Sequence, residues 1–282
     1  MTSGSATSGL DESMEPELRR TLLSGFSLAL GGANVIMQLS RLPIGRGVAE
    51  SSVESGSLHR HPLKRTRTTL SYVMIALFGT EHEREVMRRE VNAQHRQVRS
   101  KQDSPVAYDA FDPELQLWVA ACMYRGVEDA ATILYRDQAS AILDQFYRHS
   151  ARFATTLQVP ASLWPEDRAA FERYWEEGLT HVEMDDVTRR FLYGVASLDF
   201  LPLGLGRVFG PSHRFITTGF LPERFRQELG LTWGPRRQRL FRGLCVVEAR
   251  LNAVAPRPVR EFPWNMYLWE ARRRIRRNRP IV

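Results

Sequence analysis

The sequence predicts an all-α protein with a single helical domain. Apolar residues recur at helical spacing through most of the 282-residue chain, and several of these segments begin with recognisable helix caps. Alternation of apolar and polar residues, the pattern of a strand, is not found, and no repeat unit recurs. We divide the chain into a flexible Ser- and Gly-rich leader (1–14), a helical domain (15–262) and a basic tail (263–282).

The segment 21–40 is uncharged and long enough to span a bilayer, so it needs a test of its own. Several small and polar residues lower its mean hydropathy, among them Gly31, Gly32, Asn34 and Gln38. We therefore expect a buried core helix here rather than a membrane-spanning one. The first nine residues lack a basic stretch followed by an apolar one, so we do not interpret them as a signal peptide.

Two helices are expected to follow, over 63–78 and from 80 to about 98. The first has one apolar face and ends at Gly79; the face consists of Leu70, Val73, Met74 and Leu77. Thr80 and Glu83 then have the spacing of a capping box, in which each side chain bonds the other residue's backbone N–H.

Further helices are predicted from Asp112 onward, with Asp112 as N-cap and Pro113 in the first turn. Two more are expected at 141–156 and 167–179, with a proline-rich turn between them. Prolines should break the C-terminal third into shorter helices, at Pro202, Pro211, Pro222, Pro235 and Pro256.

The net charge of +7 is concentrated near the C-terminus, where six arginines cluster: Arg272, Arg273, Arg274, Arg276, Arg277 and Arg279. Without them 33 basic residues face 32 acidic ones, which leaves +1. We interpret the tail as a solvated terminus; contact with nucleic acid or with an anionic membrane surface stays open. Cys122 and Cys245 are far apart, which excludes a disulfide framework and fits a reducing, cytoplasmic location.

His95 is the central candidate for a functional residue. It lies in register with Met87, Val91 and Val98, so its imidazole is expected to project from the apolar stripe of its helix. An imidazole in a core either bonds a polar neighbour or binds a metal, and spacing alone favours the polar neighbour. One inward histidine without further protein ligands suits haem better than zinc, because the porphyrin supplies four donors itself.

The other histidines do not complete a metal site with it. His82 lies thirteen residues earlier on the same helix, which places it roughly 220° around the helix axis from His95. His59 and His61 form a His-x-His pair in a Ser- and Gly-rich loop, and we expect both to face solvent.

The helix before His95 offers polar groups for one side of such a pocket. Arg65, Thr69 and Tyr72 share one face of it, apart from the leucine stripe. A guanidinium over an apolar cavity would bind a carboxylate, a propionate or a reduced oxygen species. The alternative is that Arg65, with Lys64 and Arg67, belongs to a solvated first turn.

Seven segments in order resemble the MpaB and latex clearing protein (rubber oxygenase) catalytic-domain family, over about residues 20–260. They are GVAESS (47–52), HPLKRTRTT (61–69), ALFGT (76–80), VNAQH (91–95), YDAFDPELQLWV (108–119), LWP (163–165) and LTWGPR (231–236). The resemblance implies a globin-like helical core with added helices around haem b. It also implies that His95 is the axial iron ligand and that Arg65 and Thr69 are pocket residues. In rubber-cleaving members a lysine precedes that threonine and can reach the iron; here Thr68 takes its place, so the sequence departs from the pattern of the rubber-cleaving members at this position.

The resulting hypothesis is a haem b-dependent oxygenase that acts with dioxygen on an apolar substrate, such as an isoprenoid or another alkene. Arg65 and Thr69 would stabilise negative charge on oxygen, and Leu70, Met74 and Trp118 would line the substrate path. We also assign Trp118 to the cofactor-binding residues. The alternatives are a haem-binding protein without oxygenase turnover, or a helical nucleic-acid-binding module that uses the arginine tail.

Overall fold

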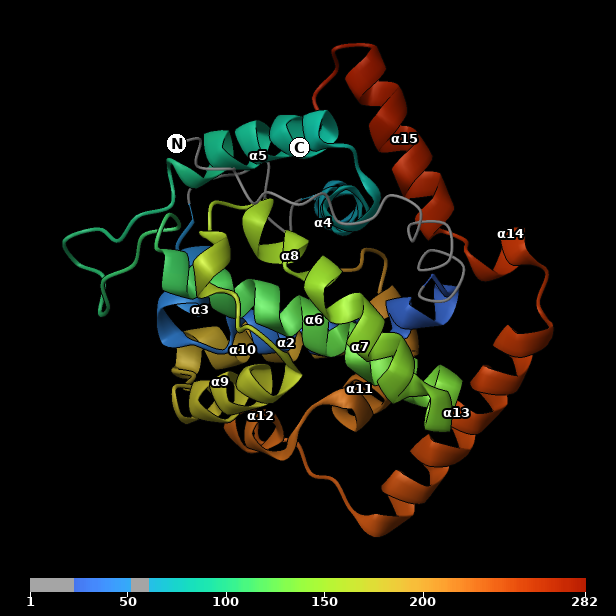
Figure 1. Cartoon of the computed structure of the whole chain (residues 1–282). Helices are drawn as coiled ribbons and strands as arrows, with labels where there is room; N and C mark the ends of the chain where they lie inside the picture. Colours follow the sequence, from blue (N-terminus) through green and yellow to red (C-terminus); the bar gives the residue numbers. More distant parts are fainter. Residues whose placement is uncertain (1–22, 52–60) are drawn as a thin grey trace.

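The computed structural model describes residues 23–51 and 61–282, and these residues form an all-α fold, as predicted (Figure 1). The extended pairing found among them is a single bridge between Arg99 and Asp109. The leader (1–14) lies outside the described residues, as does His59. No helix of the described segments is long and apolar enough to cross a membrane.

The N-terminal half of the fold contains η2 (Gly25–Leu30), α2 (Gly31–Leu39), α3 (Leu42–Ala49), α4 (Pro62–Phe78), α5 (Glu81–His95) and α6 (Pro113–Tyr135). Next come η4 (Arg136–Gln138), α7 (Ala139–Ser150), α8 (Arg152–Thr155), η5 (Ala161–Leu163), α9 (Arg168–Thr180) and α10 (Asp186–Ser197). The C-terminal part consists of α11 (Leu205–Phe220), α12 (Glu223–Glu228), α13 (Pro235–Val254), α14 (Arg257–Arg260) and α15 (Trp264–Arg276).

The described part of the uncharged N-terminal segment is a 3-10 turn followed by a helix rather than one continuous helix. Ser24 caps η2 by accepting a hydrogen bond from the Phe26 backbone. In α2, Ile36 and Met37 are buried, as expected for a core helix. Gly32 allows α2 to approach α11, because a Cβ there would meet the His213 and Thr217 side chains.

The predicted capping motifs are confirmed. Thr80 and Glu83 form both bonds of the capping box that begins α5, and Asp112 accepts hydrogen bonds from the first turn of α6. Helix α5 is shorter than predicted: it ends at His95, where the Val98 backbone N–H bonds the His95 carbonyl in a turn. That turn directs the chain into the bridge at Arg99.

Helix α6 passes through the centre of the molecule and packs against α2, α7, α8 and α13 (Figure 1). Its fully buried Tyr124 lies at the centre of an aromatic cluster, with ring contacts to Phe146, Tyr147, Trp164 and Phe171. Edge-to-face contacts of this kind add to the stability that burial of the rings provides. The rings come from α6, α7, α9 and the turn before α9, so the cluster joins them into one core.

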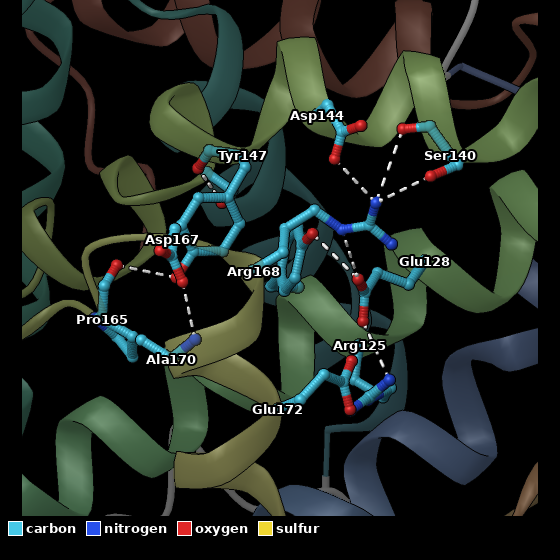
Figure 2. A network of polar contacts seen from close by, with 12 residues as sticks. Arg125, Glu128, Ser140, Asp144, Tyr147, Pro165, Asp167, Arg168, Ala170 and Glu172 are labelled. Atoms are coloured by element: carbon cyan, nitrogen blue, oxygen red, sulfur yellow. Dashed lines mark hydrogen bonds and ion pairs between the residues drawn. The ribbon is translucent and has the colours of Figure 1, made fainter.

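A buried polar network fastens the same helices (Figure 2). The Glu128 carboxylate of α6 is 5% exposed and pairs with Arg125 at 2.9 Å and Arg168 at 3.4 Å. The Tyr124 hydroxyl donates a 2.9 Å hydrogen bond to it, while Arg125 also pairs with Glu172 of α9. Removing one partner would leave a buried charge uncompensated, so these residues fix how α6 and α9 pack.

The prediction that prolines break the C-terminal third is correct for most of them and wrong for Pro211. Pro222 and Pro256 precede α12 and α14, and Pro235 begins α13, where a missing N–H costs nothing. Pro211 lies inside α11, which continues to Phe220. Helix α13 has 20 residues and is therefore not a short helix.

The basic C-terminal segment is not a solvated terminus, which corrects the interpretation of 263–282. Residues 264–276 form α15, which packs along α4 and α5, and its Leu268 and Ala271 are buried. Arg272 donates hydrogen bonds to the Glu83 carboxylate and the Phe78 carbonyl. The segment rich in arginine is an amphipathic helix, in which apolar residues recur at helical spacing between the charged ones.

Candidate functional site

The predicted site residues Arg65, Thr69 and His95 lie on two consecutive helices, α4 and α5. The helices pack against each other and are joined at Gly79 and Thr80. Arg65 and Thr69 are one turn apart on α4, so they share a face. His95 is the last residue of α5, at the end remote from the joint.

His95 is partly buried, beside an aromatic ring and within electrostatic reach of a cation. Its ring meets that of Phe111 edge-on at 6.3 Å between centroids. Desolvation, together with the positive charge of Arg65, lowers the pKa of His95 to about 4. The ring is therefore neutral at physiological pH, which leaves one nitrogen lone pair free to accept a bond.

The Nδ1 atom of His95 is buried and has no hydrogen-bond partner among the described residues. Histidines that bind a metal usually donate a hydrogen bond from their second nitrogen to a carbonyl or carboxylate, which orients the ring. Among the described residues His95 has no such acceptor at Nδ1. A buried polar atom without a partner costs about 1–3 kcal/mol, so an unpaired imidazole nitrogen points to a missing partner.

Arg65 combines an exposed side chain with a desolvating environment. Water reaches the side chain, while the surrounding protein lowers the pKa of its guanidinium. A guanidinium that water reaches stays charged at neutral pH. The charge of Arg65 contributes to the lowered pKa of His95, so the two side chains lie within electrostatic reach of each other. The exposed position of Arg65 in the first turn of α4 is also that of the solvated-turn alternative, so its role in a pocket stays a prediction.

The other polar residues of α4 have different environments. Thr69 is half-buried, and Thr68, which stands where rubber-cleaving relatives have a lysine, is 9% exposed. Tyr72 is buried, and its hydroxyl donates a 2.6 Å hydrogen bond to the Phe153 carbonyl of α8. Tyr72 therefore ties α4 to α8, and its hydroxyl is not available to a ligand.

Trp118 lies in the core, with both polar and aromatic groups of its side chain in contact with protein. Its Nε1 donates a 3.0 Å hydrogen bond to the Met37 carbonyl, and its ring stacks on Trp175 at 5.1 Å. The guanidinium of Arg41 lies 4.0 Å from the ring centroid. None of these contacts connects Trp118 with His95 or Arg65, so its role in cofactor binding stays a prediction.

Three other described histidines have environments that differ from that of His95. His61 is exposed, as expected, and His82 is exposed as well. His149 is buried, and its Nε2 donates a 2.6 Å hydrogen bond to the Leu77 carbonyl. In residues 23–51 and 61–282, no three His, Cys, Asp or Glu side chains gather as they would around a metal ion.

The residues present fit haem b by the chemistry of their donor atoms. A neutral imidazole with an unpartnered nitrogen is the form of histidine that ligates iron. A charged arginine near the imidazole would bind a propionate or a polarised oxygen atom.

Two contacts of the candidate residues were not predicted from the sequence: Phe111 against His95, and Arg41 over Trp118. Phe111 lay within a recognised motif next to the Asp112 cap, whereas nothing in the sequence pairs Arg41 with a ring 77 positions later.

Fold and site together define an all-helical protein in which a partly buried His95 with an unpaired Nδ1 lies within electrostatic reach of Arg65 on the preceding helix. The chain belongs to the family described as "ER-bound oxygenase mpaB/B'/Rubber oxygenase, catalytic domain", which matches residues 18–250. The predicted family resemblance is thus confirmed, and the chain is an oxygenase catalytic domain by membership.

Two uncharacterized mycobacterial proteins are similar over most of the chain. They are Mb2261 of Mycobacterium bovis and Rv2237 of Mycobacterium tuberculosis. Each is 46% identical over 255 residues, which covers 90% of this chain and all of the relative. No solved structure matches the chain.

Proposed function

We propose that this protein is a haem b-dependent oxygenase that uses dioxygen to oxidise an apolar substrate, such as an isoprenoid or another alkene. Membership of an oxygenase family supports the reaction class. The observation that carries haem dependence is the buried, unpartnered Nδ1 of the neutral His95, within electrostatic reach of Arg65. Family membership alone does not assign a substrate.

Each of the candidate residues would have a separate role. One ring nitrogen of His95 would hold the iron, and haem b, when bound, supplies the redox chemistry of oxygen transfer. Arg65 would donate N–H groups to negative charge that develops on oxygen, and the Thr69 hydroxyl, one turn along α4, would add a further donor. Thr68 has no side-chain nitrogen, so it does not replace the lysine of the rubber-cleaving relatives.

The apolar part of the substrate would lie against α4. Leu70 is partly buried and follows Thr69 directly, which makes it the best placed of the three residues expected to line the path. Met74 and Trp118 have no exposed surface, so a substrate would reach them only across the side chains that cover them. Apolar side chains beside Arg65 and Thr69 would exclude water from the reacting atoms.

Absorbance of the protein purified after haem-supplemented expression tests the proposal. We expect a Soret band in the wild type and in His82→Ala, which alters an exposed histidine of the same helix, and its loss in His95→Ala. An unchanged band in His95→Ala, or none in the wild type, would overturn it. Oxygen uptake with an isoprenoid such as squalene then separates an oxygenase from a protein that only binds haem.

A further inference from the structure

Helix α13 exposes a continuous apolar stripe that nothing in the described structure covers. Five of its side chains follow one another at intervals of four, three, four and three residues. They are Leu240 (59% exposed), Leu244 (47%), Val247 (53%), Leu251 (56%) and Val254 (80%). This spacing places all five on one face of the helix, which at 20 residues is about 30 Å long.

The stripe points away from the helix's own contacts with the body of the protein. Phe241 packs edge-on against the Phe220 ring at 4.9 Å, and Asn252 accepts a hydrogen bond from Ser24. Each of these two residues directly follows a residue of the stripe, so each lies about 100° around the axis from it. Figure 1 shows α13 at an outer edge of the molecule, continued by α14 and α15.

Arginines border the stripe on its other side. Arg239 and Arg250 each directly precede a stripe residue, about 100° in the opposite direction from the body. The helix carries five arginines against one acidic residue, Glu248, a net charge of +4. No ion pair involves these arginines within the described residues, which distinguishes them from Arg272 and Arg274 of α15.

We propose that α13 docks the protein on an anionic lipid surface. An apolar stripe bordered by arginines is the pattern of helices that lie in a membrane interface, with leucine and valine among the acyl chains and guanidinium groups on lipid phosphates. A second copy of the chain is the poorer occupant, because two helices of charge +4 would be brought side by side. The inference is independent of the haem site.

Vesicle flotation with the full chain tests the proposal. We expect binding to vesicles of phosphatidylcholine mixed with phosphatidylglycerol, weak binding to phosphatidylcholine alone, and release in molar salt, where the screening length is about 3 Å. The double variants Leu244→Ser with Leu251→Ser, and Arg239→Gln with Arg250→Gln, should each lower the partition coefficient about tenfold or more. All four side chains lie outside the core, so the thermal unfolding midpoint should not change.

Val187→Ser with Arg173→Gln, two exposed positions on α10 and α9, is the matched control and should bind like the wild type. Undiminished binding of either α13 variant would overturn the proposal, as would failure of the wild type to bind. Loss of binding in Arg276→Gln with Arg277→Gln alone would assign the contact to α15 instead. A dimer in light scattering that the leucine variant dissociates would identify a second copy as the occupant.

Discussion

Two desolvated histidines of this protein differ in their hydrogen bonding. The His149 imidazole lies between α7 and α4 and donates its N–H to the Leu77 carbonyl, so its burial is compensated. His95 is also desolvated, and its buried Nδ1 has no such partner. Spacing could not distinguish these situations, because both histidines lie on amphipathic helices. The partner of His149 is 72 residues away in the chain.

Acid stability should report on His149. Burial, assisted by the charge of Arg152, lowers its pKa to about 4, against an ordinary value of 6.5. The unfolded chain therefore binds the proton first as the pH falls, and stability that is complete above pH 6.5 is lost toward pH 4. His149→Gln retains an N–H donor but does not titrate. Between neutral pH and about pH 4 the wild type should lose more stability than the variant. The difference between the two losses in free energy of unfolding should reach about 3 kcal/mol.

Chemical denaturation at a series of pH values measures this difference. His181→Gln, which changes an exposed histidine, should follow the wild-type curve. A His149→Gln curve parallel to the wild type over the whole range would contradict the assignment.

Arg65 should affect turnover more than cofactor content, because in the proposed function His95 and not Arg65 holds the iron. Removing one preorganised donor to a developing negative charge typically costs about 10²–10³ in rate. We expect Arg65→Gln to retain the Soret band while its oxygen consumption with substrate falls about a hundredfold. Arg89→Gln, an exposed change on α5, should consume oxygen at the wild-type rate. Equal rates in both variants would remove Arg65 from the reaction.

On the scale of helices, close packing rests on glycines at crossing points. A Cβ at Gly178 of α9 would lie 2.5 Å from Cζ3 of Trp118 and 3.0 Å from the Arg41 guanidinium. Arg41 and the stacked Trp118 and Trp175 rings therefore leave no space for a side chain at position 178. Gly243 of α13 is also helical, and a Cβ there would meet nothing within 4 Å.

These two glycines predict opposite responses to alanine. Gly178→Ala should lower the free energy of unfolding by about 1–3 kcal/mol, because the core is already filled. Gly243→Ala should raise it by about 0.5–1 kcal/mol, because alanine is the better helix former and has space. Urea denaturation of both variants measures the contrast, which would disappear if Trp118 could move aside.

Across the whole molecule, α15 closes the fold over α4, which carries Arg65 and Thr69. Leu268 is 1% exposed and faces the body, whereas its neighbour Trp269 is 55% exposed. Leu268→Ala should cost about 2–5 kcal/mol by leaving a cavity. Trp269→Ala should cost much less, although it removes more atoms from the same helix. Thermal unfolding of the pair distinguishes a packed helix from a solvated tail, for which both changes would be nearly neutral.

The starts of several helices could be predicted from the sequence because they depend on neighbouring residues, whereas the end of α5 and the passage of α11 through Pro211 could not. The bonds of Thr80 with Glu83, and of Asp112 with the first turn of α6, connect residues two or three apart. The same holds for Pro235 at the start of α13. A motif of a few residues contains all the atoms of such a cap, so sequence alone suffices.

Burial and partnership depend instead on residues distant in the chain, and only the tertiary structure decides them. Whether Arg272 is solvated depends on Glu83, 189 positions away, and whether Trp118 has a free face depends on Arg41 and Trp175. The inward His95 and its family motifs could be read from the sequence, whereas its unpaired Nδ1 could not. Spacing gives the direction of a side chain from its own helix, and packing alone determines what it meets.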